Sequence, residues 1–221
     1  KNLAIELGVN SEKIIVINPG IDPIKNIEKK HFDEAEKLLK NKKPRLITVS
    51  RFDKRKNHEK ITMALKNLKQ IYPNILYTCI GNGEELENIK KLVNELQLKD
   101  QVLLLEEISQ ELKNALVAKS NLFVMPSVIH KKSVEGFGVV YVEAAQYGVP
   151  SIAGKDGGAS DAIIDYKTGL IVDGNNLEEI YSAINELLDK NKFIEFGKAA
   201  KENSINFHWD KVIQKYLKIL N

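Results

Sequence analysis

Short apolar runs alternate with longer amphipathic stretches along the chain. The apolar runs hold hydrophobic residues in succession rather than at every second position, which is typical of strands buried on both faces of a sheet. We expect strands in these runs, at residues 13–18, 46–50, 75–80, 101–105, 121–127, 149–154 and 168–173.

The stretches between the apolar runs repeat hydrophobic residues at helical spacing. In residues 83–98 these are Leu86, Ile89, Leu92, Val93 and Leu96. Ser109 is placed to cap another helix, because its hydroxyl can accept from an amide of the first turn. We expect helices within residues 57–72, 83–98, 109–119, 135–148, 176–190, 191–203 and 209–220.

Strands that alternate with helices along a chain predict a parallel sheet with helices on both faces. The fold class is therefore α/β, a doubly wound, Rossmann-like domain. Neither an internal repeat nor a Pro/Gly-rich linker interrupts the pattern, so we expect residues 1–221 to form a single domain.

The composition is that of an ordinary globular protein, with 43% hydrophobic and 29% charged residues. No apolar run is long enough to predict a membrane span. The net charge of +3 is small and the basic clusters lack interleaved aromatic residues, which argues against nucleic-acid binding. The single cysteine, Cys79, lies in an apolar run, so we expect it to be a reduced core residue and the protein to be cytoplasmic.

Charged residues and glycines follow five of the predicted strands. They are Arg51 and Lys56, Gly81–Gly83, Glu106–Ile108, Glu135–Gly138, and Gly157 and Gly158. In a doubly wound sheet, ligands bind beyond the carboxyl ends of the strands, so these residues outline one candidate site. Gly81–Gly83 alone is interpreted as a turn, because Leu86 stands where a dinucleotide fingerprint has its third glycine.

Two glutamates mark the segment "EGFGVVYVEAAQYG". Glu135 precedes a glycine-rich loop, and Glu143 lies eight positions later within an apolar run. In a regular helix that offset is about 12 Å along the axis and about 80° around it, so both carboxylates could point to one side. That spacing suits two ends of one elongated ligand, and is too wide for a metal site or for a glycosidase carboxylate pair. The start of this helix is also a candidate anion site.

Arg51 and Lys56 supply the complementary charge. Arginine binds phosphate oxygens with its planar fork, whereas lysine acts as a point charge. Two cations, a helix start and two separated carboxylates together predict a pocket for a sugar joined to a nucleotide diphosphate. The cations would also stabilise negative charge on the phosphate as the sugar leaves.

Several motifs resemble those of a known family: "IIVINPGID", "SRFDKRKNHE", "VMPS", "EGFGVVYVEAAQYGVPSIAGKDGGASDAI", "KTGLIVDGNN" and "FHWDKVIQKYL". The chain resembles, over nearly its whole length, the C-terminal half of the retaining glycosyltransferases of family 4, which have the GT-B fold. Within that family it resembles the bacterial phosphatidylinositol-mannoside mannosyltransferases and their relatives. Glu135, the GFG that follows it, and Glu143 are the most specific part of this resemblance.

The resemblance implies a role for each candidate residue. Arg51 and Lys56 would bind the donor diphosphate, and Glu135 would bind hydroxyls of the donor sugar. Glu143 would bind the ribose. The remaining substrate-binding positions are implied to be Gly136, Phe137, Gly138 and Val139 for sugar and phosphate, and the backbone at Glu107 and Ile108 for the base.

The resemblance also implies transfer with retention, with no metal and no cofactor beyond the donor. Two positions depart from the family pattern. Glu106 stands where the family often has glycine, and Asp161 replaces a glutamate, so no role is assigned to Asp161.

The chain matches only the donor-binding half of such enzymes, so we expect the partner to be an N-terminal acceptor domain of the same protein. We expect this half alone to have little or no turnover. The resemblance favours GDP-mannose as the donor, with UDP-sugars close behind. A lipid acceptor would place the enzyme at the inner face of the membrane, in peripheral contact with it.

Other functions stay open at this point. One is a non-catalytic subunit that binds a nucleotide sugar for a partner chain. Another is a different GT-B enzyme, such as a sugar-nucleotide epimerase or a phosphorylase, and a third is a nicotinamide-dependent oxidoreductase. His58 is expected to begin a helix and Trp209 to anchor the last helix, rather than to bind a ligand. His130 and His208 lack the spacing of metal ligands.

Overall fold

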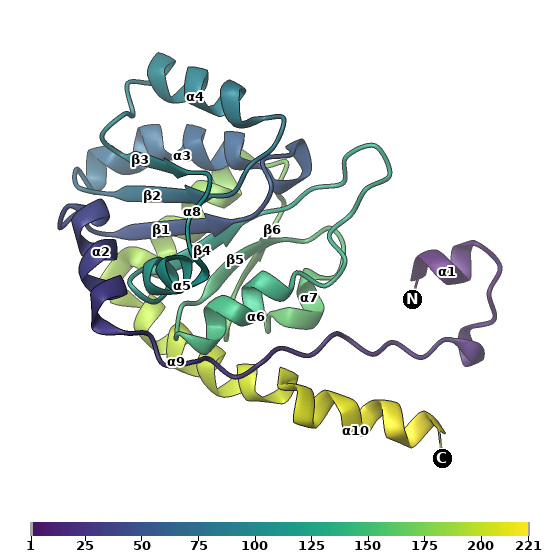
Figure 1. Ribbon diagram of the computed structural model, residues 1–221. Helices are drawn as coiled ribbons and strands as arrows, with labels where there is room; N and C mark the ends of the chain where they lie inside the picture. Colours follow the sequence, from purple (N-terminus) through teal and green to yellow (C-terminus); the bar gives the residue numbers. More distant parts are fainter. Residues whose placement is uncertain (1, 221) are drawn as a thin grey trace.

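Parallel strands form the centre of the molecule. The computed structural model describes the backbone of residues 2–220 and the side chains of residues 4–220. Within this range a six-stranded sheet has the order β3-β2-β1-β4-β5-β6, with every neighbouring pair parallel (Figure 1). The strands are β1 Arg45–Val49, β2 Leu76–Ile80, β3 Val102–Leu105, β4 Leu122–Met125, β5 Ser151–Gly154 and β6 Gly169–Val172.

Helices cover both faces of this sheet, which confirms the doubly wound, Rossmann-like prediction. Successive residues of β1 point to opposite sides, so Leu46 joins one apolar cluster and Ile47 the other. The Leu46 cluster contains residues of α3 His58–Ile71, α4 Leu86–Glu95 and α8 Leu177–Leu188. The Ile47 cluster contains residues of α2 Lys29–Leu39, α5 Gln110–Ala118, α6 Val139–Gln146 and α7 Ala159–Ala162.

The remaining elements are three helices near the ends of the chain and four short 3-10 turns. They are α1 Asn2–Glu6, α9 Phe193–Ser204, α10 Trp209–Leu220 and the 3-10 turns η1 Ser11–Lys13, η2 Lys54–Lys56, η3 Asp189–Asn191 and η4 Ile205–Phe207. Helix α9 packs against α6. Among the described residues no helix combines the length and the apolar content needed to cross a bilayer.

One strand prediction is wrong. Residues 13–18 form no strand, and the side chains of Ile15 and Val16 are exposed. The outer strands of the sheet are β3 and β6, and this segment runs away from both of them (Figure 1). A β-rich sequence without a neighbouring strand cannot form the ladder of hydrogen bonds that defines a strand.

Three helices were not predicted, whereas several local predictions are confirmed. The unpredicted helices are the short α1 as well as α2 and the single-turn α7. Ser109 caps α5 by accepting from the amide of Leu112 at 3.2 Å, and Cys79 is a buried free thiol.

The entering segment and the last helix are joined to each other. The amide of Ile21 donates to the carbonyl of Phe207 at 2.8 Å, and the amide of Trp209 donates back to the carbonyl of Ile21 at 3.2 Å. The indole of Trp209 lies directly over Gly20, where even a β-carbon would clash with it. Trp209 thus anchors the start of α10, as predicted, and both ends of the chain leave the body on the same side (Figure 1).

Candidate functional site

The strand order reverses between β1 and β4, which is the place where doubly wound sheets bind ligands. The loops that follow these two strands contact each other. The amide of Val128 donates to the carbonyl of Arg55 at 2.9 Å, and the side-chain amide of Asn57 donates to the carbonyl of Pro126 at 2.9 Å. Residues far apart in sequence are therefore held side by side at the carboxyl edge of the sheet.

The loop after β1 presents its cations through the 3-10 turn η2. Asp53 caps this turn, because its carboxylate accepts from the amide of Lys56 at 3.1 Å. Asn57 then adopts a left-handed conformation with φ 64° and ends the turn, and α3 begins at His58 as predicted. This short capped turn directs the side chains of Arg55 and Lys56 toward the loop after β4.

Glu135, in the loop after β4, forms ion pairs with both Arg55 and Lys56. Its Oε2 atom lies 2.5 Å from Nζ of Lys56 and 2.8 Å from Nη1 of Arg55. The hydroxyl of Ser127 is 3.5 Å from the same oxygen. The side chain of Glu135 is only 10% exposed. Its other oxygen, Oε1, makes no hydrogen bond to a described residue, so it is available to accept from a ligand hydroxyl.

Arg51 and Lys56 have different environments. Lys56 is buried and paired with Glu135, whereas the side chain of Arg51 is 79% exposed and touches only the edge of Asp53, at 3.4 Å. Arg51 therefore extends into solvent at the rim of the site, where an anionic ligand can bind it without a large desolvation cost.

Close packing excludes a side chain at two glycines in and beside the glycine-rich loop. Gly138 has a φ of 75°, and a β-carbon there would lie 2.4 Å from the ring of Tyr141. A β-carbon on Gly158 would lie 1.7 Å from the carbonyl of Gly136, and the amide of Gly158 donates to the carbonyl of Glu135 at 2.9 Å. The loop between β5 and α7 thus packs against the backbone of Glu135 and fixes its position.

This loop leaves a row of free donors at the start of α6. Within the described part of the chain, no hydrogen bond is made by the amides of Gly136, Phe137, Gly138 and Val139. The ring of Phe137 is buried 5.4 Å from the ring of Phe207, so only the backbone of Phe137 can meet a ligand. Amides at a helix start bind anions, which agrees with the predicted anion site.

The predicted geometry of the two glutamates is wrong. Helix α6 begins at Val139, so Glu135 lies in the loop before it, and the offset of a continuous helix does not apply. Glu143 is on α6. Its side chain is 42% exposed and lies 3.7 Å from Nζ of Lys113 on α5.

Glu143 lines a cavity of about 550 Å³ beside α6. The cavity is bounded by the first half of α5, by one side of α6 along its whole length, by Trp209 and by the entering segment, residues 20–28. Its volume is sufficient for a nucleoside-sized ligand. Glu107 and Ile108 come just before α5, with Glu107 exposed and Ile108 partly buried. Gln110 and Glu111, which follow them closely, line the same cavity.

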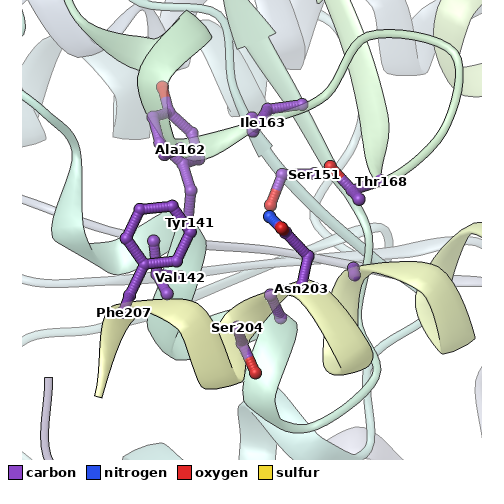
Figure 2. Close-up of a pocket in the computed structure, with 11 residues that line it drawn as sticks. Tyr141, Val142, Ser151, Ala162, Ile163, Thr168, Asn203, Ser204 and Phe207 are labelled. Atoms are coloured by element: carbon purple, nitrogen blue, oxygen red, sulfur yellow. The ribbon is translucent and has the colours of Figure 1, made fainter. Parts of the chain in front are cut away.

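A second cavity lies between α6, α9, the first residue of β5 and the segment from the end of α7 to β6 (Figure 2). In Figure 2 the amide of Asn203 points toward Ser151, and Tyr141 and Phe207 close the opposite side. Its volume of about 10 Å³ holds at most one water molecule. It contains none of the predicted site residues and is a packing gap, not a substrate site.

His58 stabilises the site without taking part in it. Its ring stacks on Phe52 at 4.3 Å, Nε2 lies 3.0 Å from the hydroxyl of Ser50, and Nδ1 lies 3.0 Å from the hydroxyl of Tyr77. Burial lowers the pKa of His58 to about 4, so the ring is neutral at physiological pH. The histidine therefore fixes the loop after β1 to the core.

We did not predict from the sequence that Arg55, Asp53 and Ser127 belong to the site. Arg55 was visible only as one residue of the basic cluster "DKRKNHEK". Asp53, three positions before Lys56, was the available signal, because an aspartate at that offset caps a turn and fixes which side chains face inward.

Among the described residues, no group of three or more His, Cys, Asp and Glu side chains could hold a metal ion.

Comparisons with known proteins identify relatives of this chain. A phosphatidylinositol monomannoside mannosyltransferase of Mycolicibacterium smegmatis, named as GDP-mannose-dependent, is 32% identical over 171 residues, which are 76% of this chain and 45% of that protein. An uncharacterised glycosyltransferase of Methanocaldococcus jannaschii is 30% identical over 99% of this chain and 55% of its own length. The chain spans about half the length of these relatives.

Solved structures show the same fold. The crystal structure of Anabaena HepE in complex with UDP superimposes with a TM-score of 0.84 at 21% identity, over 98% of this chain and 59% of that one. The family model described as "Glycosyl transferases group 1" matches residues 29–206. That range includes both loops at the switch point, and the Rossmann-like fold is that of one half of a GT-B enzyme. The chain therefore belongs to the glycosyl transferases group 1 family.

Proposed function

We propose that this chain is the donor-binding half of a retaining glycosyltransferase that uses a nucleotide-diphosphate sugar. The observation that carries the proposal is the meeting of a basic turn after β1 with the carboxylate of Glu135 after β4. Cations, free backbone amides and a fixed carboxylate acceptor lie together at this edge of the sheet, and binding of a charged sugar donor requires all three.

The donor diphosphate would lie between Arg51, Lys56 and the free amides at the start of α6. In the reaction the bond between the anomeric carbon and the terminal phosphate oxygen breaks, and a bond to the acceptor oxygen forms. The acceptor proton passes to the departing diphosphate. Cations that face this phosphate stabilise the negative charge that develops as the bond breaks.

The donor sugar would be held by Glu135. Because Oε2 is already occupied by two cations, Oε1 is the atom that would accept from a sugar hydroxyl. The nucleoside would extend toward the cavity beside α6, where Glu143 would accept from the ribose hydroxyls and the backbone at Glu107 and Ile108 would meet the base. No step of this scheme uses a metal or a further cofactor.

GDP-mannose and UDP-sugars are both candidates for the donor. The mycobacterial relative is named as GDP-mannose-dependent, whereas the Anabaena structure contains UDP. The residues assigned to the base would contact it through the backbone, so their side chains do not separate guanine from uracil.

A second half of the same protein would bind the acceptor. Two features support this part of the proposal: the chain spans about half the length of its relatives, and α10 exposes apolar residues at the same side as the N-terminus. The exposed side chains on α10 include Ile213, Tyr216, Leu217 and Leu220. We expect a cytoplasmic enzyme, in contact with the inner face of the membrane if its acceptor is a lipid.

The test is turnover by the longer protein that would contain this chain. It is supplied with GDP-mannose or UDP-glucose and a panel of lipid and sugar acceptors, and the anomeric configuration of the product is read by proton NMR. We expect transfer with retention, lost in the Glu135→Gln variant and absent from residues 1–221 alone. Inversion of configuration contradicts the retaining mechanism, and a protein that binds donor but transfers to no acceptor of the panel supports the non-catalytic subunit.

A further inference from the structure

Arg55 was not among the predicted site residues, yet it contacts Glu135. Its Nη1 atom lies 2.8 Å from Oε2 of Glu135, the same oxygen that Lys56 contacts. Its Nη2 atom lies 3.8 Å from Oδ2 of Asp53. The side chain of Arg55 is only 12% exposed, so its guanidinium faces these two carboxylates rather than solvent.

Three cations and two carboxylates meet in this cluster. Arg55 and Lys56 contact Glu135, and Arg55 and the exposed Arg51 contact Asp53. In the proposed donor complex a diphosphate would compete with Glu135 for Lys56, and without Arg55 the carboxylate of Glu135 would then keep no cation. A buried carboxylate that loses its only cation is strongly destabilised, and it would be drawn out of position.

Arginine is suited to hold two carboxylates at once, because its guanidinium is a rigid fork that stays charged. In this cluster one arm of the fork faces Glu135 and the other faces Asp53. Asp53 is itself fixed as the cap of η2, so the guanidinium is held from the side of the loop after β1. The orientation of Glu135 is therefore set through Arg55 by the fold of that turn.

We propose that Arg55 is a positioning residue for the donor sugar. It holds Oε2 of Glu135 when the diphosphate engages Lys56, and so keeps Oε1 directed to a sugar hydroxyl. Arg55 acts through Glu135 and does not touch the donor itself. This inference rests on the proposed function, and it adds that recognition of the sugar, separately from that of the nucleotide, depends on Arg55.

The test is calorimetric binding of UDP, UDP-glucose, GDP and GDP-mannose to the 221-residue chain. Arg55→Met removes the charge and keeps most of the volume, and Arg55→Lys keeps the charge but not the fork. Lys54→Met is the matched control, because Lys54 is exposed on the same turn and makes no ion pair with a described residue. Circular dichroism and melting temperature establish that each variant is folded.

We expect Arg55→Met to weaken binding of the preferred nucleotide sugar at least tenfold while the matching nucleoside diphosphate changes less than threefold. Arg55→Lys should fall between Arg55→Met and the wild type, and Lys54→Met should match the wild type for all four ligands. A merely structural role would weaken nucleotide and nucleotide sugar by the same factor.

Two results separate the inference from the proposal on which it rests. If the wild type binds a nucleotide sugar and Arg55→Met binds it equally well, or loses nucleotide and nucleotide sugar in parallel, the positioning role is wrong and the donor site stands. If the folded wild type binds none of the four ligands, the donor site itself is wrong and the role of Arg55 fails with it.

Discussion

Nζ of Lys56 lies 2.5 Å from Oε2 of Glu135, although 79 positions separate the two residues in the chain. Parallel topology creates this contact, because β1 and β4 are neighbours and both loops leave the same edge of the sheet. The pair joins the phosphate-binding and the sugar-binding parts of the proposed donor site. A substitution of either residue therefore alters the surroundings of both parts.

Replacing Glu135 with glutamine should separate catalysis from nucleotide binding. The variant keeps the shape but leaves Lys56 without its anion, so a nucleoside diphosphate should bind at least as tightly as before. Transfer by the longer protein should fall by roughly 100-fold or more, because the sugar loses a charged partner in the transition state. Calorimetry and initial rates measure the two effects, with Glu84→Gln, an exposed glutamate, as the control. Equal loss of binding and rate would contradict the division of roles.

Arg51 should contribute to binding but not to stability. Its side chain is 79% exposed and its pairing with Asp53 is loose, and exposed ion pairs of this kind contribute about 0–1 kcal/mol. Arg51→Met should weaken nucleoside diphosphate binding roughly tenfold, since a hydrogen bond to a charged phosphate is lost. The urea midpoint should stay unchanged. A variant that binds normally, or one that is clearly destabilised, would show that Arg51 is an ordinary loop residue.

Glu143 should recognise the ribose rather than the phosphates. We expect Glu143→Ala to weaken the binding of UDP or GDP by roughly tenfold, because the ribose loses a charged hydrogen-bond partner. Binding of inorganic pyrophosphate should stay unchanged. Competition calorimetry with both ligands makes the comparison. Glu143 is paired with Lys113 at 3.7 Å, so Lys113→Met serves as a control for loss of that ion pair alone. Parallel weakening of pyrophosphate would remove the ribose assignment.

His58 should make the fold sensitive to mild acid. Burial lowers its pKa from an ordinary 6.5 to about 4 in the folded state, so the unfolded chain binds the proton more readily. The stabilising contribution is fully present above pH 6.5 and is lost as the pH falls from 6.5 through about 4. The free energy of unfolding should fall by on the order of 3 kcal/mol over that window from this group.

Urea unfolding at several pH values measures this contribution, with His58→Gln as the comparison. The variant should be less stable at pH 7, because the stacking on Phe52 is lost, but should show a shallower decline toward pH 4. Identical pH profiles for the two proteins would mean that His58 is not the group responsible.

The sheet could be predicted from the sequence because its strands are short apolar runs bounded by turns. Six of these runs are strands in the structure, and the order of strands and helices then leaves little choice of fold. Residues 13–18 have the same local character but no neighbouring strand, and local sequence does not report the presence of a partner. Helix α2 was missed although Ala35 and Leu39 are buried on it, because few of its other residues are apolar.

The site was predicted in its parts but not in its geometry. The residues at the strand ends could be located, since topology places such residues at one edge. The shared contact of Arg55 and Lys56 with Glu135 depends on the turn at η2 and on the packing of Gly158 under Gly136, and neither is set by local sequence. Glu143 lies within an apolar run, yet its side chain is 42% exposed and lies beside Lys113 of α5, a contact that local sequence does not report.

Calorimetry on the 221-residue chain measures whether it binds a nucleotide-diphosphate sugar. GDP, UDP, ADP and their sugar conjugates are titrated into the wild type and into Arg51→Ala and Glu143→Ala. We predict that one nucleotide and its conjugates bind selectively, and that both variants lose most of this affinity. A folded wild type that binds none of them, or variants that bind as well as the wild type, would contradict it.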